Sequence, residues 1–319
     1  MTKSSSISVL ITYFNEQELL VRCLQSINKQ LLSPFEVIIY DDASEFAAEQ
    51  YVDHSLYHYP IKIVKSEINK GPGYGRNLLM SLVKSDYFRF QDADDELFNN
   101  TLLEIESAIN KSKADIILNE VTSYNEKGEL ISEKVIGLSK NIDDIFDFSL
   151  THALLTPSIT YKRKTAILTD RFKERNVLPQ SEDTDFNRRI FSKTNSFYFI
   201  DKSLAKQNIR LLSHSSQGQL DIWTSNLKSL LDLREEINVN HLPAFAEALL
   251  KTGLQLYNLK DFQLTKIAFD TYKATGFADY KQYNSIKRVM AKLIGPMATE
   301  DISMLYRKLM PQKIRKKIR

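Results

Sequence analysis

The chain has 319 residues, of which 43% are hydrophobic and 26% charged, and its formal net charge at pH 7 is +3. This composition is ordinary for a globular protein, and the length favours one large domain with a smaller second one. Cys23 is the single cysteine, which excludes an intramolecular disulfide and a cysteine-based zinc site. No stretch approaches the roughly 18 apolar residues of a membrane span, and the polar start has no apolar run of the signal-peptide type. A cytoplasmic protein, at most lying on the inner face of a membrane, is therefore expected.

Strands and helices are predicted to alternate along the first two thirds of the chain. Short apolar runs that end in polar residues predict strands, and apolar residues at helical spacing predict helices. The predicted strands are 7–13, 35–40, 61–64, 87–90, 116–118 and 197–200. The predicted helices of this region are 19–27 and 77–83. The alternation predicts an α/β fold with a mostly parallel sheet and helices on both faces.

The pattern becomes purely helical after about residue 220. Trp223, Leu227 and Leu230 fall at helical spacing, and no strand pattern recurs further along. Two domains are therefore expected, an α/β domain at 1–218 and a helical domain at 219–319.

Acidic residues follow two of the predicted strands directly. Asp41 and Asp42 follow the strand at 35–40, and Asp92, Asp94 and Asp95 follow the strand at 87–90. Ligands of open α/β sheets bind at the carboxyl ends of strands. A single aspartate there is most often a helix cap or a turn former, but the dense second group favours a hard divalent cation, Mn²⁺ or Mg²⁺.

Several segments together resemble the bacterial glycosyltransferase family 2 enzymes, which are inverting enzymes of the GT-A fold. The resemblance covers about residues 7–215. It is carried by Ser8–Glu16 (SVLITYFNE), Cys23–Ile27 (CLQSI) with Gln30, Glu36–Ser44 (EVIIYDDAS), Asn69–Gly71 with Arg76–Asn77, Gln91–Asp95 (QDADD), and Ser181–Phe186 (SEDTDF) with Arg188–Arg189. Each segment alone is a weak signal, and their shared order makes the resemblance strong.

The resemblance implies a nucleotide-sugar donor, with uracil as the expected base. The residues it implies for donor binding are Tyr13, Asn15, Asp41, Asp42, Asn69, Arg76, Asp92 and Ala93. Asp42 or Asp41 would contact the base, Tyr13 and Asn15 would lie near it, and Arg76 would lie near the diphosphate. Asp94 would be the direct metal ligand, with Asp92 on the metal or the ribose and His214 as a further metal or phosphate contact.

Catalysis by such an enzyme requires a base for the acceptor hydroxyl. The resemblance implies Asp183 as that base and Glu182 as a group that orients the acceptor. The competing interpretation is that both acids merely start a helix, where the helix dipole favours negative charge.

The implied function is transfer of a sugar from a UDP-sugar to a carbohydrate or lipid-linked glycan acceptor, in the synthesis of capsule, O-antigen or teichoic acid. The alternative is a catalytically inactive relative that binds a nucleotide or a glycan as an interaction module. Retention of Asp92, Asp94 and Asp183 together favours the enzyme. A nicotinamide enzyme is disfavoured, because Gly71, Gly73 and Gly75 follow the third strand rather than the first.

The C-terminal tail is strongly basic. Residues 307–319 contain seven basic side chains and no acidic one. Ile302, Leu305, Tyr306 and Leu309 share one helix face before Pro311, so the tail could lie in an anionic membrane interface. The alternatives are packing on the protein body or on a second copy of the chain in a homodimer. Nucleic-acid binding is disfavoured because the rest of the chain is acidic.

Overall fold

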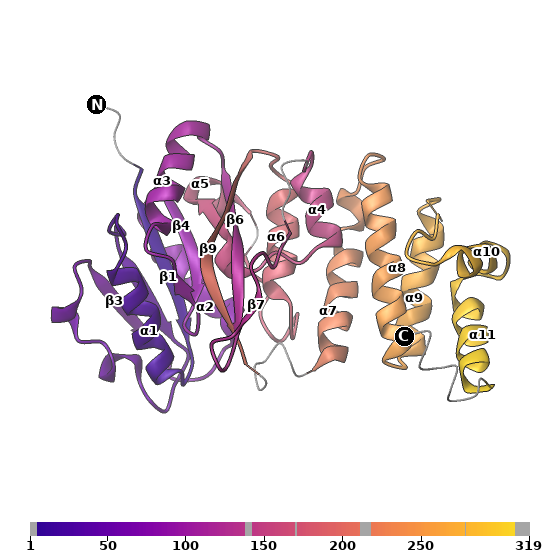
Figure 1. The fold of residues 1–319 in the computed structure, drawn as a ribbon, viewed down its shortest axis with the longest axis horizontal. Coiled ribbons are helices and arrows are strands. Elements are labelled where there is room, and N and C mark those ends of the chain that lie inside the picture. The colour runs from indigo at the N-terminus through magenta and orange to yellow at the C-terminus, as the bar shows by residue number, and fades with distance from the viewer. Residues whose placement is uncertain (1–4, 138–141, 170, 211–217, 278, 310–319) are drawn as a thin grey trace. The chain divides into compact units, whose positions relative to one another are not determined.

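The computed structural model describes residues 5–137, 142–169, 171–210, 218–277 and 279–309. The chain divides into two compact units, Met1–Gly218 and Gln219–Arg319. The first unit contains the sheet and the second is helical (Figure 1).

The first half of the sheet is parallel. It consists of β1 (Ile7–Tyr13), β2 (Val37–Asp41), β3 (Ile61–Lys65) and β4 (Tyr87–Asp92). β1 lies between β2 and β4, and β3 pairs with the outer side of β2. All four strands run in one direction, so their carboxyl ends meet at one edge of the sheet.

The second half of the sheet mixes parallel and antiparallel pairing. It contains β5 (Glu96–Leu97), β6 (Ile116–Asn125), β7 (Leu130–Ser132), β8 (Ile159–Lys162) and β9 (Phe197–Ile209). Within the described ranges the order is β3-β2-β1-β4-β8-β6-β9-β5, with β7 paired to β6. β6 and β9 are parallel, whereas β8 is antiparallel to both of its neighbours, β4 and β6.

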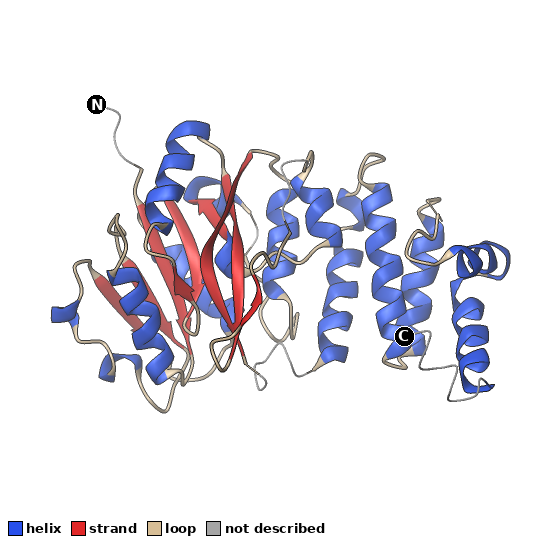
Figure 2. Cartoon of the chain, viewed as in Figure 1, coloured by secondary structure: helices blue, strands red, loops and turns tan. Residues whose placement is uncertain are grey.

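Helices cover both faces of this sheet (Figure 2). The helices of the first unit are α1 (Gln17–Asn28), α2 (Pro72–Leu82), α3 (Thr101–Ser112), α4 (Ile145–Thr151), α5 (Arg163–Leu168) and α6 (Glu182–Phe191). α1 and α3 lie on one face, and α2 and α5 lie on the other (Figure 1). α2 packs very closely against β2. A Cβ atom on Gly75 of α2 would lie only 2.4 Å from the ring of Tyr40 of β2. That contact explains the glycine on packing grounds.

An aromatic cluster joins β4 to the start of α6. The ring of Phe172 lies 5.4 Å from that of Phe90 and stacks at 4.0 Å on that of Phe186. Tyr161 of β8 contacts Phe186 as well, at 5.9 Å. Removing one such buried ring typically costs about 3–5 kcal/mol. The cluster therefore fixes α6 relative to the acidic end of β4.

The helical unit contains α7 (Gln219–Asp232), α8 (Leu242–Asn258), α9 (Phe262–Ala274), α10 (Ser285–Ile294) and α11 (Pro296–Leu309). α8 and α9 pack closely, because a Cβ atom on Gly253 would lie 2.4 Å from the ring of Phe269. Across the described ranges, no helix has the length and apolar character needed to cross a bilayer.

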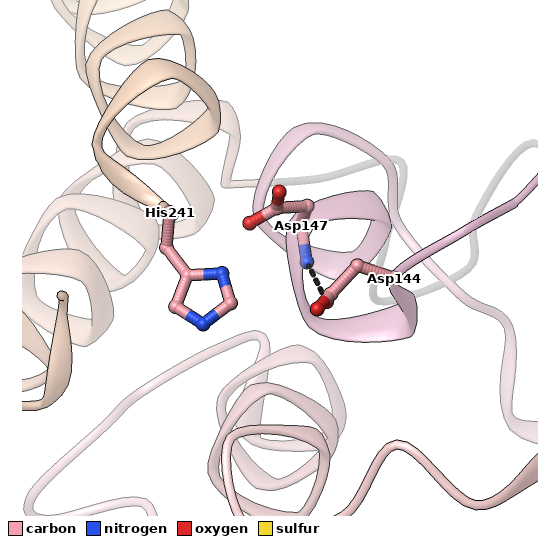
Figure 3. Close-up of side chains that lie close together, drawn as sticks. All are labelled: Asp144, Asp147 and His241. Carbon is pink, nitrogen blue, oxygen red and sulfur yellow. Dashed lines mark hydrogen bonds between the residues drawn. The ribbon is translucent and has the colours of Figure 1, made fainter. Parts of the chain in front are cut away.

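Local capping follows ordinary chemistry in both units. Asp144 accepts a hydrogen bond from the backbone N–H of Asp147 and so caps α4 (Figure 3). His241, also labelled in Figure 3, is at the N-cap position of α8 in the helical unit, but its side chain makes no capping hydrogen bond. Asp261 caps α9 and Asn284 caps α10 in the same way as Asp144.

The predicted fold class is confirmed, and every predicted strand is present, the strand at 7–13 with its predicted bounds and the others with shifted ends. The helix predicted at 77–83 begins earlier, at Pro72, because proline fits the first helical turn. β5, β7 and β8 were not predicted. Each is only two to four residues long, which is too short to show an alternating pattern.

Candidate active site

Acidic side chains from three parts of the first unit converge at the carboxyl edge of the parallel strands. Glu16 follows β1, and Asp92, Asp94 and Asp95 occur at the end of β4 and directly after it. Glu182 and Asp183 open α6. Two arginines, Arg76 and Arg210, connect these acids through ion pairs.

Arg76 of α2 joins the end of β4 to the start of α6. Its Nη1 donates to Glu182 Oε1 at 2.5 Å, and its Nη2 donates to Asp92 Oδ1 at 3.2 Å. The side chain is only 7% exposed. Burial alone would lower the pKa of Arg76, but Glu182 and Asp92 raise it further than burial lowers it. Arg76 therefore stays charged and holds the two acids together.

Arg210, directly after β9, joins two other acids. Its Nη2 donates to Asp94 Oδ2 at 2.6 Å and also to Glu16 Oε1. Asn208 fixes the same end of β9, since its backbone N–H donates to Asp95 Oδ1 and its side chain donates to the Asp94 carbonyl. Glu16 and Arg210 were not among the predicted site residues, although Glu16 ends the first family-like segment.

Asp92, Glu16 and Asp95 hold their protons more strongly than usual. Burial, with the charge of Asp94 added, raises the pKa of Asp92 to about 6. Burial and Asp94 likewise raise the pKa of Glu16 to about 7, although Arg210 opposes the rise. Burial raises the pKa of Asp95 well above its usual range. The site thus contains more negative charge than its two arginines neutralise.

Asp183 lies in the first turn of α6, close enough to Asp92 and Arg76 for their charges to interact. Burial and the neighbouring Glu182 raise the pKa of Asp183, and Arg76 opposes that rise. Its Oδ1 accepts a hydrogen bond from the backbone N–H of Thr184. Asp183 is half-buried, so it remains partly accessible to solvent.

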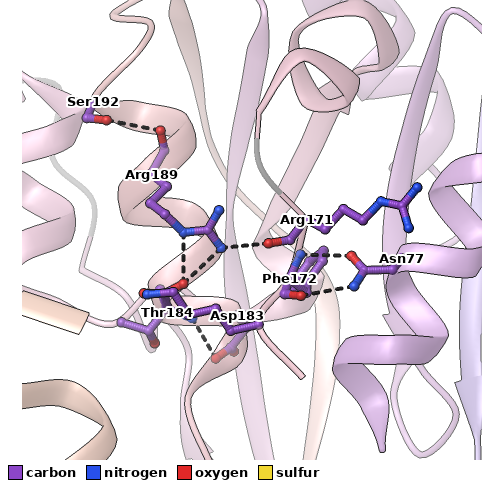
Figure 4. A network of polar contacts seen from close by, with 9 residues as sticks. Asn77, Arg171, Phe172, Asp183, Thr184, Arg189 and Ser192 are labelled. Atoms are coloured by element: carbon purple, nitrogen blue, oxygen red, sulfur yellow. Dashed lines mark hydrogen bonds and ion pairs between the residues drawn. The ribbon is translucent and has the colours of Figure 1, made fainter. Parts of the chain in front are cut away.

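A polar network holds the N-terminal half of α6 in place (Figure 4). Asp185 is fully buried and pairs with Lys173 at 2.9 Å and with Arg189 at 2.8 Å. Asn77 exchanges two hydrogen bonds with the backbone of Phe172. Asp185 is thus a structural acid, in contrast to Asp183 two residues earlier.

Asp41 and Asp42 have structural hydrogen bonds of their own. Asp41 accepts from the backbone N–H groups of Ser44 and Ala48 and is fully buried. Asp42 accepts from the N–H groups of Lys70 and Gly71 at 2.7 and 2.8 Å. Of the two, Asp42 retains slight exposure, at 5%.

The other donor-site residues predicted near β1 and β3 shape the surrounding loops. Tyr13 donates to the carbonyl of Phe46 at 2.6 Å, and burial raises the pKa of Tyr13 to about 12. Asn15 has a positive φ of 54° and accepts from the N–H groups of Glu45 and Phe46. Asn69 donates to the carbonyl of Asp42. These bonds hold the loops after β1, β2 and β3 together.

Two predicted site residues require separate comment. Ala93 is buried between Asp92 and Asp94, where a small side chain fits the turn. His214 lies outside the described residues.

The oxygen ligands that these acids offer are of the kind that a divalent cation prefers. Asp92, Asp94 and Glu16 offer hard carboxylate oxygens, and burial makes their uncompensated charge costly. A diphosphate bound there would supply the remaining oxygen ligands.

The mixed sheet and the acids at the end of β4 define a fold of the GT-A type. The family model described as "Glycosyl transferase family 2" matches residues 8–168, and the chain belongs to this family. The structure of TarS residues 1–349 from S. aureus in complex with UDP-GlcNAc is similar, with a TM-score of 0.60 and 18% identity. That match covers 84% of this chain and 92% of the other, and it supports the fold.

Curated relatives are similar over different lengths. The glycosyltransferase GlyA of Streptococcus pneumoniae is 22% identical over 92% of this chain and 42% of its own length. The teichoic acid poly(glycerol phosphate) polymerase of Staphylococcus epidermidis is 32% identical over 30% of this chain and 15% of its own. The chain thus spans less than half of the length of these relatives.

Proposed function

We propose that this protein is an inverting glycosyltransferase that moves a sugar from a UDP-sugar to a hydroxyl of a carbohydrate acceptor during synthesis of a bacterial surface polysaccharide. The observation that carries the proposal is the placement of Asp183 beside the acidic end of β4, across the buried Arg76. Membership of glycosyl transferase family 2 supports the reaction class. Relatives named as a teichoic acid poly(glycerol phosphate) polymerase and as poly(ribitol-phosphate) glycosyltransferases support an acceptor of the teichoic acid class, and capsule and O-antigen are the alternatives.

On the donor side, Asp94 and Asp92 would hold Mn²⁺ or Mg²⁺. The cation would stabilise the charge that develops on the leaving diphosphate. Arg76 keeps Asp92 oriented and contributes positive charge at the same place. The loops fixed by Tyr13, Asn15, Asp41, Asp42 and Asn69 would enclose the base, with Ala93 beneath the sugar. The complex of TarS with UDP-GlcNAc supports a UDP-linked donor.

On the acceptor side, Asp183 removes the proton from the attacking hydroxyl. The proton ends on the carboxylate of Asp183, whose raised pKa suits it to accept a proton. One base and one leaving group suffice for a single displacement, which inverts the anomeric centre. Glu182 is bound to Arg76, so it would orient the acceptor from that fixed position.

The proposal is tested by incubating the full chain with a panel of nucleotide-sugars, with Mn²⁺ and with chelator. Release of UDP from one UDP-sugar, lost in chelator and lost in Asp183→Asn, is the expected result. Binding of a UDP-sugar without release of UDP, with or without glycan acceptors, would favour the inactive binding module instead.

We also propose that the helical unit binds the anionic inner face of the cell membrane. Ile286, Val289 and Leu293 of α10 are 75%, 58% and 78% exposed, and Leu305 and Leu309 of α11 are 57% and 76% exposed. Basic residues flank these apolar side chains, and more follow after residue 309. Such a surface suits a bilayer interface and would bring the enzyme to a lipid-linked acceptor. A second copy of the chain would cover the same side chains in a homodimer.

A further inference from the structure

One nitrogen atom of Arg210 lies between two carboxylates from different loops. Nη2 donates to Asp94 Oδ2 at 2.6 Å and to Glu16 Oε1, and each of these three side chains is partly buried. Glu16 follows β1, Asp94 follows β4 and Arg210 follows β9. Oxygens of both acids therefore converge on one point, and a positive group occupies that point.

This point coincides with the position where the proposed function needs a divalent cation. Asp94 is the expected direct ligand, and its Oδ2 is already bound to Arg210. Two cations cannot occupy one point between the same oxygens. Binding of a metal ion at these oxygens therefore requires the guanidinium to leave them.

We propose that Arg210 is a resident counter-ion that a divalent cation displaces, and that Glu16 belongs to the cation site together with Asp94. This inference rests on the proposed function, because it assumes that the site binds a metal. Before the donor arrives, Arg210 offsets part of the negative charge of the two acids. After displacement, the same guanidinium is released next to the site.

Features of Arg210 favour its release. The guanidinium is held by the two ion pairs made through the one nitrogen Nη2, and its buried Nε, like that of Arg76, has no hydrogen-bond partner within the described part of the chain. The anchor of β9 is separate from it, because Asn208 is bound to Asp94 and Asp95 through other atoms. Arg210 can thus leave the carboxylates without detaching the end of β9.

The contrast with Arg76 supports the assignment. Arg76 also connects two acids, but it does so through two different nitrogens and is 7% exposed, whereas the Arg210 side chain is 34% exposed. Arg76 fits a permanent part of the site. Arg210 is more exposed and is bound through one nitrogen, as expected of a group that can be displaced from the site.

The experiment measures Mn²⁺ binding to the full chain without nucleotide, by the electron paramagnetic resonance signal of free Mn²⁺. A bound competitor reduces the apparent affinity to the fraction of sites that it leaves free, so Arg210→Gln, which removes the competitor, should bind Mn²⁺ about tenfold more tightly than the wild type. Arg210→Lys, which keeps the charge, should fall between the two. The double variant Glu16→Gln with Arg210→Gln should lose about tenfold relative to Arg210→Gln alone, because a carboxylate ligand is missing.

The matched control is Arg22→Gln, since Arg22 is an exposed arginine paired with Glu96 nearby. It removes the same charge without emptying the site, and its Mn²⁺ affinity should equal that of the wild type. Wild-type binding of Mn²⁺ with no gain in Arg210→Gln would overturn this inference and leave the proposed function standing. An equal gain in Arg22→Gln would also overturn it, as a general field effect. Absence of Mn²⁺ binding by every variant, with or without UDP, would overturn both.

Discussion

Arg76 and Glu182 are 106 positions apart in the sequence and are joined at 2.5 Å, so a buried charge pair connects α2 to α6. The pair connects the glycine-rich start of α2 to the acids that open α6. Because Asp183 follows Glu182 directly and Arg76 also pairs with Asp92, the pair helps to position Asp183 relative to β4. Arg76 is therefore expected to serve stability and chemistry together.

Arg76→Gln should destabilise the first unit by about 2 kcal/mol, less than the 3–5 typical of broken buried pairs, because the Asp92 side chain is 35% exposed. Two acids would lose their shared cation. Urea unfolding of the metal-free protein measures the change. Arg22→Gln, which breaks an exposed pair, should cost far less, and equal losses in the two variants would contradict the structural role of Arg76.

Asp183→Asn should lower transfer by roughly 10²–10⁴, the usual contribution of a general base, while UDP affinity stays near that of the wild type. Asp185→Asn provides the matched control on the same helix. Asp185 is buried between Lys173 and Arg189, so its variant should lose thermal stability more than Asp183→Asn does. Near-normal transfer by Asp183→Asn would remove Asp183 from the mechanism.

Asp94→Ala should abolish the part of UDP affinity that depends on Mn²⁺, an expected loss of at least about tenfold, or 1.4 kcal/mol. Calorimetric titration of UDP with and without Mn²⁺ measures this part directly. Asp270→Ala, which removes an exposed acid on α9, should leave it unchanged. A metal-dependent affinity that survives in Asp94→Ala would transfer the ligand role to Asp92 or Asp95.

The metal-free protein should lose stability as the pH rises. The pKa of Asp92 is raised to about 6 and that of Glu16 to about 7, from 3.8 and 4.5. Acids with a raised pKa in the folded state favour folding while protonated, and this contribution is lost as the pH passes through 6 and 7. Between pH 5 and pH 8 we expect Tm to fall by about 2–4 °C, the effect of roughly 1 kcal/mol in a domain of this size.

Differential scanning fluorimetry in chelator measures this fall. Glu16→Gln should flatten the curve, because the side chain that titrates nearest neutrality is gone. Mn²⁺ with UDP should reduce the fall, since both bind the deprotonated site. A Tm that rises over the same interval in the absence of metal would contradict the charge excess described for these acids.

Substitution of the apolar face of α10 tests the membrane proposal. The double variant Ile286→Ser with Leu293→Ser should sediment less with phosphatidylglycerol vesicles than the wild type, and high salt should release both proteins. Ile167→Ser with Leu168→Ser is the control, because these side chains are also exposed but belong to the first unit. Equal partitioning of all three proteins would exclude α10, and a loss of dimer in the α10 variant would assign the face to a second copy.

The sequence allowed the fold and the acidic end of β4 to be predicted, because both have local signals. Buried apolar runs that end in acids are visible residue by residue, as at Tyr87–Asp92. The ion pair of Glu16 with Arg210 spans 194 positions and has no local signal. The hydrogen bonds that fix Asp42 were equally hidden, since they depend on how the loops after β2 and β3 meet.

The clamp of Asn77 on the backbone of Phe172 has a consequence for how such an enzyme can diversify. Together with the buried Asp185, it sets the position of Asp183 from the interior of the first unit. The segment between α5 and α6 supplies Phe172 and Lys173 to these bonds. The other loops of the unit can therefore vary in sequence while Asp183, the proposed base, keeps its place.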